Sequence, residues 1–250
     1  MKCSYCGEEV GNVSVCPICG SALAAAAAAA APAPAAEPVI SEAHISGADL
    51  FERNVNGVME LSVRCGTQFF CGSGYLINSQ GYAITNSHVV VEKGKLCNSC
   101  TARLAGGESP VQVISVGTKN DFCSNDDLAV IKLTKLPAKA TPVRFADSTK
   151  VRTGERVYII GNSLGEGTCI TSGIVSDNNR DGQFMYDSAT NGGNSGGPVF
   201  NEDGNVIATH VRGGRRDGSG AKPQGMNGGI PSVYAMKMLD KAGVKYDLEK

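Results

Sequence analysis

Short apolar runs alternate with turn-forming residues over most of the chain, from about residue 47 to residue 250. The runs are rich in β-branched residues, and Gly, Asn, Asp and Ser separate them, which is the pattern of strands joined by tight turns. Strands are predicted at residues 74–77, 83–85, 111–116, 128–133, 156–160, 170–176 and 206–211. This succession of short strands predicts an all-β barrel or sandwich.

One segment near the end of the sequence has a helical period instead. In residues 232–242, apolar side chains recur at Val233, Met236 and Leu239, and Gly243 follows as a helix terminator. We therefore expect a single short C-terminal helix after the last strand.

Residues 1–46 lack the alternating pattern and divide into two parts. Residues 1–20 hold four of the ten cysteines, and residues 21–46 are rich in Ala and Pro. Prolines interrupt any helix that the alanines form, so the second part is expected to be a linker. Its alanine run is too short and too weakly apolar to span a membrane. The predicted organisation is a small module at 1–20, a linker at 21–46 and a main domain at 47–250.

Composition and charge narrow the range of functions. The 250 residues include 32 Gly and no Trp, charged residues make up 19%, and the formal net charge is −1. A net charge near zero gives no electrostatic reason to expect binding to nucleic acid or to an anionic membrane. No apolar signal segment follows Met1, so we expect a cytoplasmic protein that does not associate with membranes.

The N-terminal module carries two CxxC pairs, Cys3/Cys6 and Cys16/Cys19, about ten residues apart and each followed by Gly. Two such turns supply the four thiolates that tetrahedral Zn²⁺ prefers. About twenty residues cannot bury a useful core, so a metal would supply most of the folding free energy. We expect a structural zinc site, with two disulfides or a redox-active CxxC as the alternatives.

The most specific chemical motif is Thr190-Asn-Gly-Gly-Asn-Ser195-Gly-Gly-Pro. A nucleophilic serine needs a tight turn that exposes its hydroxyl and points neighbouring amides at an oxyanion, and the four glycines around Ser195 permit such a turn. The amides of Gly193 and Ser195 are the expected oxyanion donors.

Two further stretches supply the partners of this serine. Tyr82-Ala-Ile-Thr-Asn-Ser-His88 predicts a strand that runs into a histidine, and Asp127 opens the apolar strand Leu-Ala-Val-Ile. His88 would accept the Ser195 proton, and Asp127 would orient His88 and stabilise it once charged.

These stretches, in the order His, Asp, Ser, resemble the trypsin-like peptidase family, especially its HtrA/Deg and glutamyl-endopeptidase branches. The matches also include Gly72-Ser-Gly-Tyr-Leu-Ile and residues 154–161, 171–175 and 229–232. The resemblance implies a chymotrypsin-like fold of two antiparallel Greek-key β-barrels, with His88 and Asp127 in the first barrel and Ser195 in the second. It favours Asp127 over Asp126, because the family's acid directly precedes the Leu-Ala-Val-Ile strand. The chain departs from the HtrA pattern after the C-terminal helix, where we expect no PDZ domain. The CxxC module resembles N-terminal zinc ribbons, which implies docking to a protein partner or a purely structural role.

Glutamyl endopeptidases carry Thr and His where Thr190 and His210 fall in this chain, and the resemblance implies that these residues line the S1 pocket. A substrate carboxylate in a partly desolvated pocket needs charge-assisted donors, which Thr190 and His210 can supply. Arg212 lies two residues along the strand from His210 and is expected on the same face. We expect cleavage after Glu or Asp, with small aliphatic P1 residues and a purely structural His210 as the alternative.

Six more cysteines lie in the main domain: Cys65, Cys71, Cys97, Cys100, Cys123 and Cys169. With no secretion signal, we expect free thiols packed as small apolar groups. A second metal site that uses the Cys97/Cys100 pair is the alternative.

The sequence therefore predicts a serine endopeptidase that hydrolyses protein or peptide substrates through an acyl-enzyme formed on Ser195, with no cofactor for catalysis. The competing hypothesis is a catalytically silent, peptide-binding adaptor recruited through its zinc ribbon.

Overall fold

The structure is a computed structural model that describes residues 2–3, 6–11, 13, 15–21, 45–118, 124–213 and 225–249. The chain divides into two units, Met1–Ala43 and His44–Lys250. The main part of the predicted linker, residues 22–44, lies outside the described residues. Of the helices described, none is long and apolar enough to cross a membrane.

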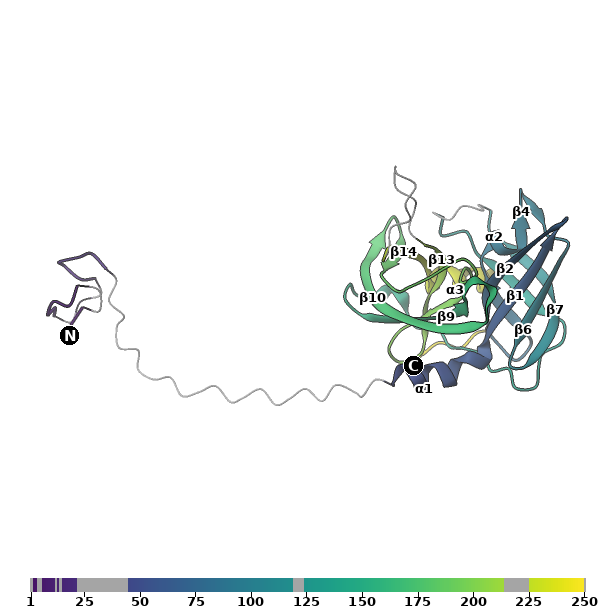
Figure 1. Cartoon of the computed structure of the whole chain (residues 1–250), viewed down its shortest axis with the longest axis horizontal. Coiled ribbons are helices and arrows are strands. Elements are labelled where there is room, and N and C mark those ends of the chain that lie inside the picture. The colour runs from purple at the N-terminus through teal and green to yellow at the C-terminus, as the bar shows by residue number, and fades with distance from the viewer. Residues whose placement is uncertain are drawn as a thin grey trace. The chain divides into compact units, whose positions relative to one another are not determined.

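The larger unit contains two closed antiparallel barrels, blue to teal and green to yellow in Figure 1. The first barrel has the strand order β1-β2-β3-β8-β7-β6. Its strands are β1 (Val58–Cys65), β2 (Gln68–Leu76), β3 (Tyr82–Thr85), β6 (Ser99–Leu104), β7 (Gly107–Val116) and β8 (Ala129–Leu133). The short hairpin of β4 (Val91–Glu92) and β5 (Lys95–Leu96) and the single-turn helix α2 (Ser87–Val90) lie between β3 and β6 in the sequence.

The second barrel has the strand order β10-β11-β14-β13-β12-β9. Its strands are β9 (Arg156–Asn162), β10 (Thr168–Arg180), β11 (Gln183–Tyr186), β12 (Pro198–Phe200), β13 (Val206–Arg212) and β14 (Asn227–Pro231). The short 3-10 turns are η1 (Val55–Gly57), η2 (Ser148–Lys150) and η3 (Ser163–Gly165). The predicted all-β fold with two antiparallel barrels is confirmed.

Two longer helices flank the barrels. Helix α1 (Gly47–Asn54) begins at the N-cap Ser46, whose hydroxyl accepts a hydrogen bond from the Asp49 amide. Helix α3 (Ser232–Lys241) follows β14 directly and buries Ala235 and Leu239. It is the predicted C-terminal helix, whereas α1 was not predicted.

A single apolar cluster joins the two barrels. Tyr75 comes from the first barrel, Phe200 from the second, and Leu239 from α3, and all three are fully buried in this cluster. The barrels therefore share a core in addition to their own interiors, and this shared packing fixes the orientation of the loops that meet between them.

Candidate active site and metal site

His88 and Asp127 form a direct pair. His88 Nδ1 lies 2.6 Å from Asp127 Oδ2, and the backbone amide of His88 donates to Asp127 Oδ1 over 2.9 Å. Asp127 is fully buried, while 16% of the His88 side chain is exposed. Both carboxylate oxygens thus contact the same residue, which fixes the imidazole ring and directs Nδ1 inward.

Local hydrogen bonds dock helix α2 onto the segment that carries Asp127. The Asn86 side chain donates to the Asp127 carbonyl over 2.7 Å, and the Ser87 hydroxyl donates to the Leu128 carbonyl over 2.6 Å. Asp126 points elsewhere, because its carboxylate accepts from the Thr118 amide over 2.6 Å. The structure therefore brings Asp127, and not Asp126, to His88.

Ser195 lies in the turn between β11 and β12 of the second barrel. Gly193 and Gly196 on either side have φ values of +96° and +85°, which favour glycine. The Ser195 hydroxyl donates a long hydrogen bond of 3.5 Å to the Val211 carbonyl. Among the described residues, the amides of Gly193 and Ser195 have no hydrogen-bond acceptor, so both donors are available to a ligand.

The Ser195 turn contacts the first barrel close to His88. The Ser195 carbonyl accepts a hydrogen bond of 2.8 Å from the Ser73 amide of β2. A Cβ at Gly196 would overlap the Thr85 hydroxyl, and a Cβ at Gly72 would contact both Val89 and the Ser195 carbonyl. Because Thr85 and Val89 flank His88 in the sequence, the serine turn and the histidine helix lie on the same stretch of the barrel interface.

The structure brings two of the three predicted S1 residues close to the buried side chain of Tyr186. His210 is 1% exposed, and its Nδ1 lies 2.5 Å from the Tyr186 hydroxyl, which also donates to the Gly228 carbonyl. Burial raises the pKa of the Tyr186 phenol well above its usual value, and the positive charge of Arg212 acts in the opposite direction. Tyr186 therefore lies within the electrostatic reach of Arg212 and in direct contact with His210.

Arg212 does not follow the expectation that it lies on the same face of the strand as His210, and the Thr190 hydroxyl already donates to another side chain. A β-bulge separates His210 from Arg212 in the pairing with β14, so the two-residue alternation does not apply between them. Arg212 Nη2 lies 3.8 Å from Met185 Sδ, and its buried Nε has no acceptor among the described residues. The Thr190 hydroxyl donates to Asn227 Oδ1 over 2.6 Å.

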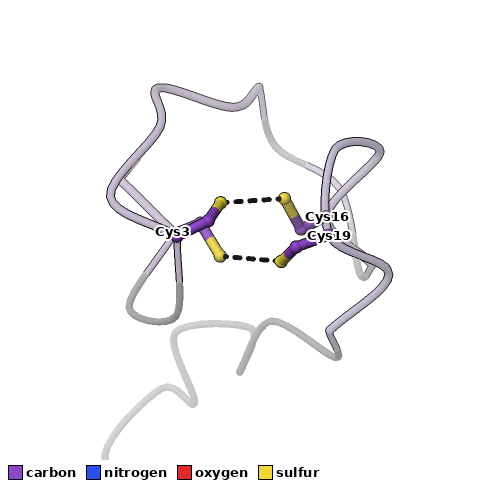
Figure 2. A group of neighbouring side chains, drawn as sticks. Cys3, Cys16 and Cys19 are labelled. Atoms are coloured by element: carbon purple, nitrogen blue, oxygen red, sulfur yellow. Dashed lines mark hydrogen bonds between the residues drawn. The ribbon is translucent and has the colours of Figure 1, made fainter.

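The four cysteines of the N-terminal unit converge, as Figure 2 shows for the labelled Cys3, Cys16 and Cys19. All four Sγ atoms lie within 4.8 Å of one another. The Cys3–Cys19 and Cys6–Cys16 sulfur separations are 3.7 and 3.8 Å, too long for disulfides. A tetrahedral site with Zn–S bonds of about 2.3 Å requires sulfurs about 3.8 Å apart. These residues can thus hold a zinc ion.

The cysteines of the larger unit correct one prediction. Cys65 and Cys97 form a disulfide, so the expectation of free thiols is wrong for this pair, and Cys97 is not available to a second metal site. Cys71, Cys100 and Cys169 are free thiols, as expected, but only Cys100 is buried, and Cys71 is exposed rather than packed as an apolar group. Burial raises the pKa of Cys100 to about 12, so its thiol stays protonated. Cys123 lies outside the described residues.

The disulfide depends on how two hairpins meet. Cys65 ends β1, which pairs with β6, and Cys97 immediately follows β5. The Asn98 amide donates to the Arg64 carbonyl over 2.8 Å, which brings the two ends together. The two cysteines are 32 residues apart in sequence, so spacing alone gave no sign of the pairing.

Comparison with known proteins finds a peptidase family model and relatives that are named as serine proteases. The family model described as "Trypsin-like peptidase domain" matches residues 72–208, more than half of the chain. The probable periplasmic serine endoprotease DegP-like of Brucella suis biovar 1 is 35% identical over 191 residues, which are 72% of this chain and 34% of that protein. The probable periplasmic serine protease do/HhoA-like of Haemophilus influenzae is 34% identical over 185 residues, 68% of this chain and 36% of that protein. The chain thus spans about a third of the length of these curated relatives.

Solved structures agree with these relatives. The HtrA-type protease AlgW with tripeptide has a TM-score of 0.65 at 27% identity, over 79% of this chain and 63% of that chain. The serine endoprotease from Yersinia pestis has a TM-score of 0.66 at 25% identity, over 80% of this chain and 68% of that chain.

The names of the relatives correct the predicted location. The relatives from Brucella suis, Rhizobium meliloti and Haemophilus influenzae are all named as periplasmic, so the prediction of a cytoplasmic protein is wrong. The two-barrel fold, the matched family model and these relatives lead to one conclusion: the chain belongs to the trypsin-like peptidase family and is similar in particular to its DegP/HtrA members.

Proposed function

We propose that the chain is a serine endopeptidase that hydrolyses protein or peptide substrates with His88, Asp127 and Ser195. The observation that carries the proposal is the pair of His88 and buried Asp127, 2.6 Å apart, on the interface that also receives the Ser195 turn. The family to which the chain belongs supports the same activity.

In the acylation step, Ser195 Oγ attacks the carbonyl carbon of the scissile bond, and its proton passes to His88 Nε2. Asp127 favours this step because its carboxylate accepts from His88 Nδ1–H, which leaves Nε2 as the acceptor and stabilises the imidazolium that forms. The amides of Gly193 and Ser195 donate to the oxygen of the tetrahedral intermediate, where negative charge develops.

Collapse of this intermediate breaks the C–N bond, and His88 gives its proton to the leaving amine. Water then attacks the acyl-enzyme while His88 accepts a proton from it, and the second collapse releases the carboxylic acid and restores Ser195. The same donors stabilise both tetrahedral intermediates, so no cofactor is required.

Mass spectrometry of an unfolded protein substrate tests this proposal. Wild type and Ser195→Ala are incubated with the substrate in parallel, and the new termini are mapped. Cuts that appear only with wild type support the mechanism. Cuts in both samples, or in neither, contradict it, and binding of the same substrate by an inactive wild type would favour the peptide-binding adaptor.

We further propose that the S1 pocket selects Glu or Asp, with His210 as the main donor to the substrate carboxylate. A protonated His210 would donate from Nδ1 to the Tyr186 oxygen, which in turn donates to Gly228 O, and its Nε2–H would face the substrate. Arg212, with its buried Nε, would add positive charge near this pair, and Thr190, whose hydroxyl donates to Asn227, would line the pocket.

Paired peptide substrates that differ only in Glu or Gln at P1 test the acidic pocket. We expect a higher kcat/KM for Glu in wild type and a smaller Glu/Gln ratio in His210→Asn, whose rate on the Gln substrate serves as the internal control. Equal rates for Glu and Gln in wild type, or cuts mainly after small aliphatic residues, would discard this pocket while leaving the peptidase in place.

For the N-terminal unit, we propose a zinc ribbon in which Cys3, Cys6, Cys16 and Cys19 hold one structural Zn²⁺. The sulfur separations of 3.7 and 3.8 Å support this ligand set. The exposed apolar side chains of Val15 and Ile18 support docking to a protein partner. Crosslinking of the full chain in its host cell, with Ile18→Ser as a variant that keeps all four ligands, tests the docking: a specific adduct that Ile18→Ser retains would argue against this face.

We also propose that the chain works in the periplasm, as the names of its relatives indicate for them. The Cys65–Cys97 disulfide supports an oxidising compartment, since disulfides persist there and are rare in the cytosol. Fractionation of the host cell tests this location, and recovery of the protein only in the cytosolic fraction would contradict it.

A further inference from the structure

Gly193 in the active-site turn has a backbone conformation that favours glycine. Its φ of +96° lies in a region that glycine enters as readily as any other. The N–H of Gly193, an oxyanion donor in the proposed mechanism, lies in the peptide plane before its Cα, and the plane after its Cα sets the path of the chain to Ser195.

Each of these two planes is held by one hydrogen bond to its carbonyl. The Gly192 carbonyl accepts from the Leu164 amide over 2.7 Å, and the Gly193 carbonyl accepts from the Ser73 hydroxyl over 2.7 Å. Because a trans peptide points its N–H opposite to its C=O, the bond at Gly192 sets the direction of the Gly193 N–H. The bond at Gly193 holds the plane that follows, together with the bond of 3.3 Å that the Asn194 amide donates to the Asn191 carbonyl. These two bonds set the path of the chain toward Ser195.

Ser73 also connects to the segment that holds the first plane. Its hydroxyl oxygen accepts a hydrogen bond of 2.9 Å from the Asn162 amide, two residues before Leu164. Leu164 itself has a positive φ of +59° and a 61% exposed side chain, so its own packing contributes little to holding it. A single hydroxyl thus connects the end of β9 to the Gly193 turn.

The backbone of Ser73 contacts the nucleophile as well. Its amide donates to the Ser195 carbonyl over 2.8 Å, and its carbonyl accepts from the Thr85 hydroxyl over 2.7 Å. Ser73 is completely buried and belongs to β2 of the first barrel, which also carries His88 and Asp127. The turn that carries the oxyanion donors of the second barrel is therefore bonded to both the side chain and the backbone of a residue of the first barrel.

We propose that Ser73 is a positioning residue for the oxyanion hole: its hydroxyl holds the Gly193 carbonyl and the Asn162 amide so that the Gly193 N–H points at the substrate oxyanion. The inference rests on the proposed function of Ser195. Ser73 touches neither the substrate nor the reacting atoms, and it acts only through the backbone of the turn.

Ser73→Ala tests this role, with Ser232→Ala as the matched control. Ser232 is also completely buried and also donates its hydroxyl to a backbone carbonyl, that of Ala146, over 2.8 Å. Loss of a whole oxyanion donor costs about 10²–10³-fold in kcat, so a misdirected donor is expected to lower kcat of Ser73→Ala by about 10–100-fold. KM stays within about twofold, and Ser232→Ala keeps the wild-type kcat.

Two further measurements separate positioning from general damage. A peptide aldehyde, which forms a tetrahedral adduct with Ser195, should lose affinity by the same factor as kcat, because its oxygen occupies the oxyanion hole. Binding of an intact peptide, measured in the Ser195→Ala background with and without Ser73→Ala, should not change. Should Ser73→Ala fail to fold, Ser73→Cys keeps a weak donor of similar size and is expected to give an intermediate kcat.

Three results would overturn the inference: a kcat of Ser73→Ala equal to that of Ser232→Ala, a loss that appears entirely in KM, or unchanged aldehyde affinity. A wild type without Ser195-dependent cleavage would instead refute the proposed function, and the two failures are thereby distinguished.

Discussion

The hydroxyl of Tyr75 in β2 lies 2.7 Å from the hydroxyl of Thr209 in β13, and both residues are fully buried. This bond joins the first barrel to the second inside the shared core. Burial raises the pKa of the Tyr75 phenol above its usual value, so the group stays neutral and the bond is a neutral one at any ordinary pH.

The Tyr75–Thr209 bond predicts a non-additive pair of substitutions. Tyr75→Phe leaves the Thr209 hydroxyl buried without its partner, and Thr209→Val does the same to Tyr75. Each is expected to lower the free energy of unfolding by about 1–3 kcal/mol. The double variant should lose clearly less than the sum, because it leaves neither hydroxyl unpaired. Urea unfolding of the four proteins measures this, and additivity within about 0.5 kcal/mol would contradict it.

The neighbouring carboxylates of Asp126 and Asp127 allow a test of which of them orients His88. Asp127→Asn should lower kcat by about 10⁴-fold, the loss known for serine proteases when the amide stabilises the wrong imidazole tautomer. Asp126→Asn should keep a kcat near wild type, since Asp126 accepts from Thr118 and not from His88. Steady-state kinetics on one peptide substrate compares them, and equal losses in both variants would refute the assignment.

The metal site predicts that zinc binding and barrel stability are separate properties. Among the described residues of the N-terminal unit, the buried apolar cluster consists of Cys3, Val10 and Cys16, so folding of this unit should depend on the metal. Metal analysis should find one zinc per chain in wild type and in Cys71→Ser, but little in Cys19→Ser. The unfolding temperature of the larger unit should not change on chelation. Equal zinc content in Cys19→Ser would exclude the proposed ligand set.

The disulfide predicts a stability that depends on reductant. Crosslinking residues 32 apart is expected to stabilise the fold by about 3–4 kcal/mol in the chain-entropy description. Reductant should therefore lower the Tm of wild type and of Cys71→Ser, which keeps the disulfide. The double variant Cys65→Ser with Cys97→Ser should have a low Tm that reductant does not change. A wild-type Tm insensitive to reductant would count against the crosslink.

Much of the fold was predictable because most strands have a strong local signal. β8 and β13 are mostly apolar and mostly buried, and their polar residues are Lys132 in β8 and Thr209, His210 and Arg212 in β13. β6 was missed because its inward positions are Cys100, Ala102 and Leu104, a weakly apolar set. β1 does alternate, with Leu61 and Val63 buried between exposed residues, so a closer count of period two would have found it.

The residues of the candidate site also differ in how far the sequence could predict them. His88, Asp127 and Ser195 stand in local motifs whose residues constrain one another, so the sequence pointed to them directly. Ser73 and Tyr186 act through contacts with residues more than twenty positions away, at Gly193 and His210. Such contacts depend on barrel closure and strand register, and no local pattern encodes them.

The division of the site between the barrels has a consequence for the point in folding at which the site becomes complete. Under the proposed mechanism, the acid–base pair belongs to the first barrel, while the nucleophile and the oxyanion donors belong to the second. β14, at Asn227–Pro231, pairs with both β11 and β13 and is the last strand in the sequence to enter the second barrel. A chain in which β14 has not yet paired is therefore expected to have the acid–base pair but an incomplete second barrel around the nucleophile turn. We therefore expect no peptidase activity before β14 has joined the second barrel.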